Sequence, residues 1–138
     1  MNISEQHKKI LRAEICPYCG SSTKRTDQLE IYGRVFSSNE VIVCDNYPKC
    51  DSYVGCHSTG ETLGRLANKE LRSAKKEAHF YFDQLWKKYK TNRGLLYKYL
   101  SEELNLPPEY THIGMFKIET CKKVAEWSKD RIKEINQE

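Results

Sequence analysis

The chain has 138 residues, of which 38% are hydrophobic and 30% are charged, and its formal net charge is +4. This length predicts one domain, or a small module joined to a helical one. The sequence lacks a run of 18 apolar residues and its first residues lack the apolar core of a signal peptide, so we expect no membrane span and no leader. We therefore expect a cytoplasmic protein with no membrane partner, in which six cysteines bind metal more readily than they form disulfides.

The first 60 residues predict a short helix followed by a small β-rich segment. The helix covers residues 4–11, with Ser4 as its N-cap. Short runs of strand-forming residues then alternate with residues that favour turns. The predicted strands cover residues 22–26, 28–32, 41–43 and 51–57, with turns near Asp27, at Gly33 and at residues 37–39.

Four cysteines lie in two short turns of this β-rich segment. Cys16 and Cys19 form a C-x2-C turn, and Cys44 and Cys50 form a wider C-x5-C turn. Two such turns can place four sulfurs at tetrahedral corners about 2.3 Å from one zinc ion. We predict one structural Zn²⁺ with these four ligands, and we expect it to supply most of the folding free energy of this half.

The residues around these cysteines resemble a known kind of zinc finger. The sequences CPYCG at residues 16–20 and CDNYPKC at residues 44–50 are similar to the small C-terminal zinc fingers of type IA DNA topoisomerases, although the spacer between the turns is longer here. The resemblance implies contact with single-stranded DNA. Zinc ribbons also serve as protein-docking modules, so a protein partner stays open as an alternative.

From Leu66 onward, apolar residues recur every three or four positions, which predicts helices. Asn68 is the expected N-cap of a long helix, and a second helix begins at Thr91 and Asn92. The second helix ends at residues 105–108, because proline cannot continue it. A loop is expected over residues 109–116, and a last helix from Ile118 to Ile135.

Together these elements predict an α+β protein. A C4 zinc ribbon over residues 1–60 is expected to pack against a three-helix region over residues 61–138 as one compact unit, because the apolar stripes of the helices must be buried.

The positive charge is concentrated on the long helix. Residues 1–60 hold seven basic and seven acidic side chains, whereas residues 65–93 hold nine basic and three acidic ones. A basic stripe of this kind fits a phosphate backbone, and the knuckle rings of Tyr18 and Tyr47 could stack on unpaired bases. An ordinary solvated helix face is the alternative. The candidate phosphate contacts are Arg65, Lys69, Arg72, Lys76, Lys87 and Arg93.

Four further segments carry a wider resemblance. The sequences YVGCH at residues 53–57, LGRLANKELR at 63–72, FDQLW at 82–86 and HIGMF at 112–116 are similar to a family known as a zinc-finger-containing domain, found in bacteria and their phages. The match would cover about residues 15–130 and supports the domain organisation, but it implies no activity. It draws attention to polar residues that folding does not require: His57, Arg72, His79, Asp83, Arg93 and His112.

Each of these polar residues has an ordinary interpretation as well. Cys56 and His57 could replace a cysteine ligand, or could simply end a strand. His79 and Asp83, four residues apart on one helix, could bind a hydrolytic metal or form a surface pair. His112 lies in the predicted loop and could approach the long helix. We therefore treat His57, His79, Asp83 and His112 as a possible polar site.

Three functions follow from these observations. The first is a non-enzymatic, zinc-dependent DNA-binding module of the kind found in phages or mobile elements. The second is a protein-binding adaptor, such as a phage-encoded inhibitor of a host enzyme. The third is a metal-dependent nuclease in which the possible polar site binds a second ion, although the sequence lacks a paired-carboxylate motif. The first is the function we expect, with nucleic acid as the partner.

Overall fold

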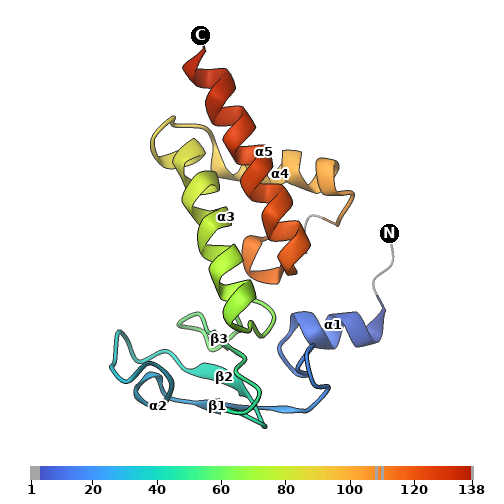
Figure 1. Ribbon diagram of the computed structural model, residues 1–138, viewed down its shortest axis with the longest axis vertical. Helices are drawn as coiled ribbons and strands as arrows, with labels where there is room; N and C mark the ends of the chain where they lie inside the picture. The colour runs from blue at the N-terminus through green and yellow to red at the C-terminus, as the bar shows by residue number, and fades with distance from the viewer. Residues whose placement is uncertain (1–3, 108, 110, 138) are drawn as a thin grey trace. The chain divides into compact units, whose positions relative to one another are not determined.

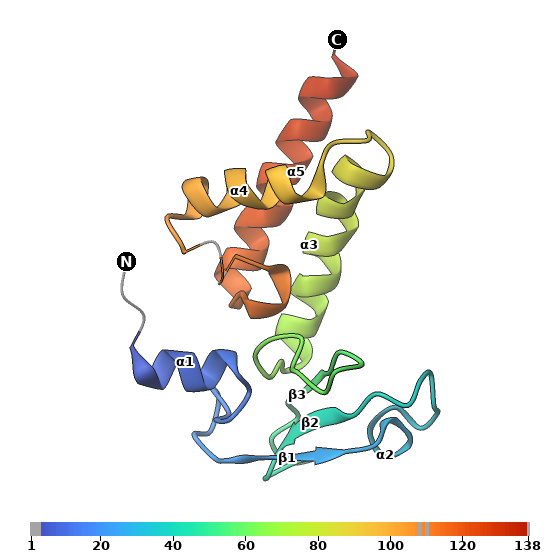
Figure 2. The same cartoon turned by 180° about the vertical axis from the view of Figure 1, so that it is seen from behind.

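A computed structural model describes residues 4–107, 109 and 111–137 (Figures 1 and 2). A three-stranded antiparallel sheet near the N-terminus is followed by long helices, which confirms the predicted α+β class. The chain divides into two compact units between Lys69 and Glu70. Within the described residues, none of the helices has both the length and the apolar character needed to cross a membrane.

The first unit opens with the predicted helix α1, Glu5–Leu11. Ser4 caps it, because its side-chain oxygen accepts a hydrogen bond from the backbone N–H of His7 at 3.1 Å. This bond satisfies one of the N–H groups that a helix start leaves without a partner. Leu11 is the buried residue of the helix.

The sheet has its middle strand completely buried. The strands are β1 (Thr23–Thr26), β2 (Val41–Cys44) and β3 (Tyr53–Gly55), in the order β1-β2-β3. All four residues of β2 are buried, as a run of β-branched residues in a central strand predicts. The pairing register sets Thr23 opposite Cys44, so the start of β1 and the end of β2 lie together at one end of the sheet.

The prediction of a strand over residues 28–32 is wrong. This segment is the helix α2, Gln28–Tyr32. The Asp27 side chain accepts a hydrogen bond from the Glu30 backbone N–H at 2.9 Å, and Gly33 ends the helix with a φ of 74°. Glycine adopts such a left-handed conformation more readily than residues with a side chain. The two caps therefore outweigh the strand-like alternation of the five residues between them.

The second unit contains the three predicted helices. They are α3 (Lys69–Lys87, whose first residue closes the first unit), α4 (Arg93–Leu104) and α5 (Ile118–Asn136). α3 and α5 run side by side in the same direction and α4 crosses them (Figures 1 and 2). A hydrogen bond of 3.1 Å from the Tyr89 hydroxyl to Asn136 joins the ends of α3 and α5.

Two connections link the helices of this unit, over residues 88–92 and 105–117. Asn92 caps α4 by accepting a hydrogen bond from the Leu95 N–H at 2.9 Å, as predicted. α4 ends at Asn105, whose φ of 53° is left-handed, and Pro108 lies outside the described residues. The expected loop before α5 contains a 3-10 turn, η2 (Ile113–Met115).

The core of the second unit is built from the predicted stripes of the three helices. Phe82 and Leu85 of α3 are almost inaccessible to solvent, as are Leu100 of α4 and Cys121 of α5. Phe80 lies on another face of α3 and is 63% exposed. The two phenylalanines therefore provide a matched pair of buried and exposed rings on one helix.

We expect Phe82→Ala to lower the free energy of unfolding of the second unit by about 3–5 kcal/mol, because it removes a fully buried ring and leaves a cavity. Phe80→Ala is the control and should cost less than about 0.5 kcal/mol. Urea denaturation of both variants, followed by circular dichroism, measures the difference. Equal losses for the two variants would contradict the described packing.

Candidate metal centre and basic face

The first cysteine turn is held tightly by backbone hydrogen bonds. The Gly20 N–H donates to the Cys16 carbonyl at 3.0 Å, and the Cys16 N–H donates to the Ser21 carbonyl at 2.8 Å. Gly20 has a φ of 78°, which explains why glycine follows the second cysteine. This turn fixes both Cys16 and Cys19 near the end of the sheet where β1 begins.

The second cysteine turn begins where β2 ends. The Tyr47 N–H donates to the Cys44 carbonyl at 2.9 Å, and the Cys50 N–H donates to the Asn46 carbonyl at 3.0 Å. The Asp45 N–H donates to the Ser22 carbonyl at 3.1 Å, which ties this turn to the residue before β1. The sheet register therefore brings the two cysteine turns together.

The four sulfurs fit one tetrahedral zinc ion. All four lie within 4.8 Å of one another, with separations of 3.6 Å between Cys16 and Cys50 and 3.4 Å between Cys19 and Cys44. A tetrahedron with Zn–S bonds of about 2.3 Å has edges of about 3.8 Å. Four thiolates are also the ligand set that zinc prefers in structural sites. The predicted ligands are thus positioned to bind one metal ion.

Hydrogen-bond donors around the sulfurs favour the thiolate form of the cysteine ligands. The Asn46 backbone N–H lies 3.4 Å from the Cys44 sulfur, and its side-chain amide lies 3.6 Å from the Cys19 sulfur. The Ser52 hydroxyl lies 3.3 Å from the Cys16 sulfur. Such outer groups orient metal ligands and offset part of their negative charge.

The thiols of the site differ in acidity. Hydrogen bonds from the side chain and backbone of Ser21 lower the pKa of Cys19 to about 6, whereas burial raises the pKa of Cys44 to about 12. Zinc binds thiolates, so its binding must displace protons from the ligands that remain protonated. Protons compete with the metal, and zinc affinity should fall as the pH falls.

The other two cysteines lie outside this group. Cys56 is buried, and its sulfur lies 3.7 Å from the Arg25 guanidinium. Burial raises its pKa, which disfavours the thiolate. Cys121 is buried on α5. His57 is exposed, and its backbone N–H donates to the Glu61 carbonyl at 2.7 Å. Neither Cys56 nor His57 belongs to the metal-binding group.

The basic face of α3 combines four of the predicted cations with an exposed ring. At about 100° per residue, Lys69, Arg72, Lys76 and Lys87 fall within one sector of the helix together with Phe80. Lys69, Lys76 and Lys87 are exposed, and Arg72 is half-buried. The sequence places Phe80 beside the basic stripe as a candidate stacking ring, and its side chain is 63% exposed.

The remaining predicted nucleic-acid contacts in the first unit are partly engaged. The Arg65 guanidinium lies 3.4 Å from the His7 ring nitrogen and is half-buried. The Tyr18 hydroxyl accepts a hydrogen bond from the Asn68 N–H at 3.1 Å, while the residue stays 43% exposed. Both side chains therefore already have partners within the unit.

Tyr47 begins a row of four aromatic rings that the sequence did not predict. Its centroid lies 6.2 Å from that of Tyr53, which lies 5.9 Å from Tyr32, which in turn lies 5.8 Å from Phe36. Phe36 is 66% exposed and the Arg34 guanidinium lies 4.7 Å from its centroid. The row extends from the second cysteine turn to the segment after α2, so it brings together rings that are far apart in the sequence.

The possible polar site is divided between the units. His57 lies in the first unit, whereas His79, Asp83 and His112 lie in the second. His79 Nδ1 lies 3.6 Å from Asp83 Oδ2, and the His112 ring lies 5.0 Å from the Tyr97 ring. Among the residues that the structure describes, the four cysteines are the one group in which three or more His, Cys, Asp or Glu side chains lie close enough to hold a metal ion.

Arg93 and His112 were also singled out from the sequence, and Tyr97 lies beside both. Burial lowers the pKa of His112, and the charge of Arg93 lowers it further. Burial raises the pKa of Tyr97. Both causes disfavour the charged form of His112 beside the Arg93 cation.

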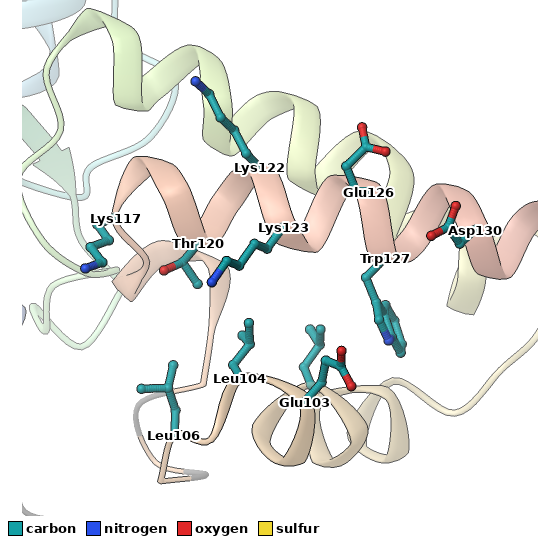
Figure 3. A pocket seen from close by; sticks show the side chains of 11 residues that line it. Glu103, Leu104, Leu106, Lys117, Thr120, Lys122, Lys123, Glu126, Trp127 and Asp130 are labelled. Carbon is teal, nitrogen blue, oxygen red and sulfur yellow. The ribbon is translucent and has the colours of Figure 1, made fainter.

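A groove of about 750 Å³ lies between α4 and α5 in the second unit (Figure 3). Leu104, Leu106 and Trp127 form apolar walls, and charged residues surround them, with Lys117 and Lys123 toward one end and Glu126 and Asp130 toward the other. Cavities of this size accommodate small ligands or a few side chains of a partner. The sequence offered no signal for it, because its lining comes from two helices and the loop between them.

The cysteine site on a small antiparallel sheet defines a protein of the zinc-finger class, with one structural zinc ion. The family described as a zinc-finger-containing domain matches residues 12–131, and the chain belongs to this family. That part of the resemblance seen in the sequence is confirmed, whereas the likeness to topoisomerase fingers stays a prediction. No curated protein and no solved structure matches the chain.

We expect the purified protein to contain one zinc ion per chain and its first unit to unfold when a chelator removes the metal, because the cysteine ligands are part of its core. Cys44→Ser should have the same effect. Elemental analysis gives the stoichiometry, and NMR spectra report the loss of structure.

Cys56→Ser is the matched control, because Cys56 is equally buried in the first unit but is not a ligand. It should retain one zinc ion. The assignment fails if Cys44→Ser leaves both the zinc content and the fold unchanged. Competition with a chromophoric chelator should also show weaker zinc binding below neutral pH than above it, as the ligands gain protons.

Proposed function

We propose that the protein is a zinc-dependent, non-enzymatic module that binds DNA with unpaired bases. The observation that carries this proposal is the exposed ring of Phe80 on the basic face of α3. An apolar ring that is 63% exposed costs hydration free energy unless a partner covers it. A nucleobase is a suitable partner, because every base can stack on an aromatic ring.

The charges around Phe80 favour a polyanion over an apolar protein surface. Lys76 and Lys87 lie in the same sector of α3 and are exposed, and the single acidic residue of that sector, Asp83, is half-buried. Lysines beside a strand of nucleic acid gain free energy by releasing the counterions condensed on its phosphates. Phosphate contacts and base stacking together describe a sequence-independent single-strand binder.

The aromatic row of the first unit supports the same function. Tyr32 is 39% exposed and Phe36 66%, and both belong to a row that begins at the second cysteine turn. The zinc ion would fix this turn, and with it the position of Tyr47. The two units would then each supply stacking surfaces, while the second unit supplies most of the positive charge.

We expect fluorescence anisotropy to show binding of single-stranded DNA that weakens as salt is added. Lys76→Gln should reduce the slope of log affinity against log salt concentration by about 0.7, as expected when one phosphate contact is lost. Phe80→Ala should weaken binding by about 5- to 150-fold with little change in slope, because stacking of one base contributes about 1–3 kcal/mol.

Tyr99→Ala is the control for Phe80→Ala, because Tyr99 is a 48% exposed ring on α4, away from the basic face. It should leave the affinity unchanged. Absence of binding to single-stranded DNA, duplex DNA and RNA at low salt would overturn the proposal. Stronger binding to RNA than to DNA would change only the identity of the partner. Equal losses of affinity in Phe80→Ala and Tyr99→Ala would show that Phe80 has no special role.

The groove between α4 and α5 favours a second candidate function, the binding of a protein. Its leucines and Trp127 form a small apolar centre surrounded by charged residues, as in a protein interface that has an apolar core and a polar rim. Lysines lie at one end of the groove and acidic residues at the other. A bound segment with an acidic end and a basic end would therefore be held in one orientation.

If the protein acts as an adaptor, a partner captured by affinity purification should remain bound after nuclease digestion and moderate salt. Leu104→Asp should then release the partner, because it places a charge in the groove. Leu95→Asp is the control on the same helix, since Leu95 is already 41% exposed and does not line the groove. A partner lost on nuclease treatment would favour DNA binding alone.

A further inference from the structure

The connection between α3 and α4 is the most one-sidedly charged stretch of the chain. Between Asp83 and Glu102 the sequence contains no acidic residue. It contains five basic ones: Lys87, Lys88, Lys90, Arg93 and Lys98. We call the part of this stretch that surrounds Arg93 the junction site, formed by Trp86, Lys87, Arg93 and Tyr97.

Two aromatic rings fix the position of Arg93. Its guanidinium carbon lies 5.1 Å from the centroid of Trp86 and 5.7 Å from the centroid of Tyr97. The Trp86 ring is itself held by a hydrogen bond of 3.0 Å from its N–H to Asp83. The Tyr97 ring packs against the buried Phe82 ring with centroids 4.8 Å apart. An exposed arginine is therefore oriented by a platform that is anchored in the core.

The positive charge of Arg93 is not balanced by an ion pair within the described part of the chain. The nearby Asp83 is already contacted by Trp86 and His79. The Arg93 side chain also forms a hydrogen bond with the Tyr97 side chain. A planar guanidinium held in this way keeps its other N–H groups available in a fixed fork, which matches two oxygens of a phosphate or a carboxylate.

A second cation shares the same platform. The Lys87 ammonium lies 5.0 Å from the centroid of Trp86, so both Lys87 and Arg93 lie against one ring. Their combined charge, with Lys88, Lys90 and Lys98 nearby in sequence, suits a phosphate better than a single carboxylate. Mutual repulsion between these cations is relieved when an anion binds.

We propose that the junction site binds a phosphate group through a bidentate contact with Arg93, assisted by Lys87. This inference rests on the proposed function for the source of the phosphate, which we take to be the DNA backbone. A terminal phosphate or a free nucleotide offers the same chemistry. The contact differs from a general basic surface because it depends on the shape of the guanidinium and not only on its charge.

The test uses the complete zinc-loaded chain, labelled with ¹⁵N and titrated with inorganic phosphate against a chloride control at equal ionic strength. The indole N–H of Trp86 and the Nε–H of Arg93 should shift in a saturable manner. The indole of Trp127, the second tryptophan of the chain, should not shift and is an internal control. Absence of a saturable shift at Trp86 and Arg93 overturns the proposal.

Two variants separate shape from charge. Arg93→Lys keeps the charge but removes the fork, and it should weaken the phosphate affinity by about tenfold. Lys98→Gln removes one exposed charge from α4 and should have a smaller effect. The bidentate contact is refuted if Arg93→Lys binds phosphate as tightly as the unchanged protein. It is also refuted if Lys98→Gln loses as much phosphate affinity as Arg93→Lys does. Circular dichroism confirms that both variants remain folded.

Oligonucleotides with and without a 5′-phosphate, and thymidine monophosphate, distinguish the sources. Equal losses for both oligonucleotides in Arg93→Lys support a backbone phosphate. A loss confined to the 5′-phosphorylated strand or to the nucleotide supports a terminal phosphate at the same site. Phosphate binding without any DNA binding would refute the proposed function but keep the junction site. Saturable shifts with a glutamate-rich peptide and none with phosphate would refute the site as assigned.

Discussion

The first unit depends on one interaction, the binding of four thiolates to a single zinc ion. Cys16 and Cys44 are not only ligands but also members of the small hydrophobic cluster that includes Ile42 and Leu66. A sheet of three short strands buries too little apolar area to balance the conformational entropy of the chain. The metal and the sheet therefore form together, and the turn residues around the cysteines matter because they bring the sulfurs within reach.

Much of this unit could be predicted from the sequence because the decisive signals are local. The cysteine spacings identify the ligands without knowledge of the fold, and Ser4 marks the start of α1 because its side chain bonds three residues ahead. Asn92 marks the start of α4 in the second unit in the same way. The same local chemistry explains the one wrong element. Residues 28–32 alternate like a strand, but Asp27 and Gly33 cap a single helical turn, and over five residues the caps decide.

The candidate binding surfaces were predictable only in part. Helical periodicity placed the lysines of α3 on one face, since that requires nothing but the repeat of the helix. The aromatic row required strand pairing and the position of α2, which bring Tyr47, Tyr53 and Tyr32 together from three separate segments. The stacking of Arg93 between Trp86 and Tyr97 likewise depends on the path of the chain between two helices.

The two phenylalanines of α3 have a wider consequence. Phe82 is enclosed by the other helices while Phe80, two positions earlier, faces outward. The residues that keep the helix in place and those proposed to contact DNA therefore lie on different faces of α3. Members of the family could exchange the outward residues, and with them the choice of ligand, while the inner side and the architecture it maintains stay the same.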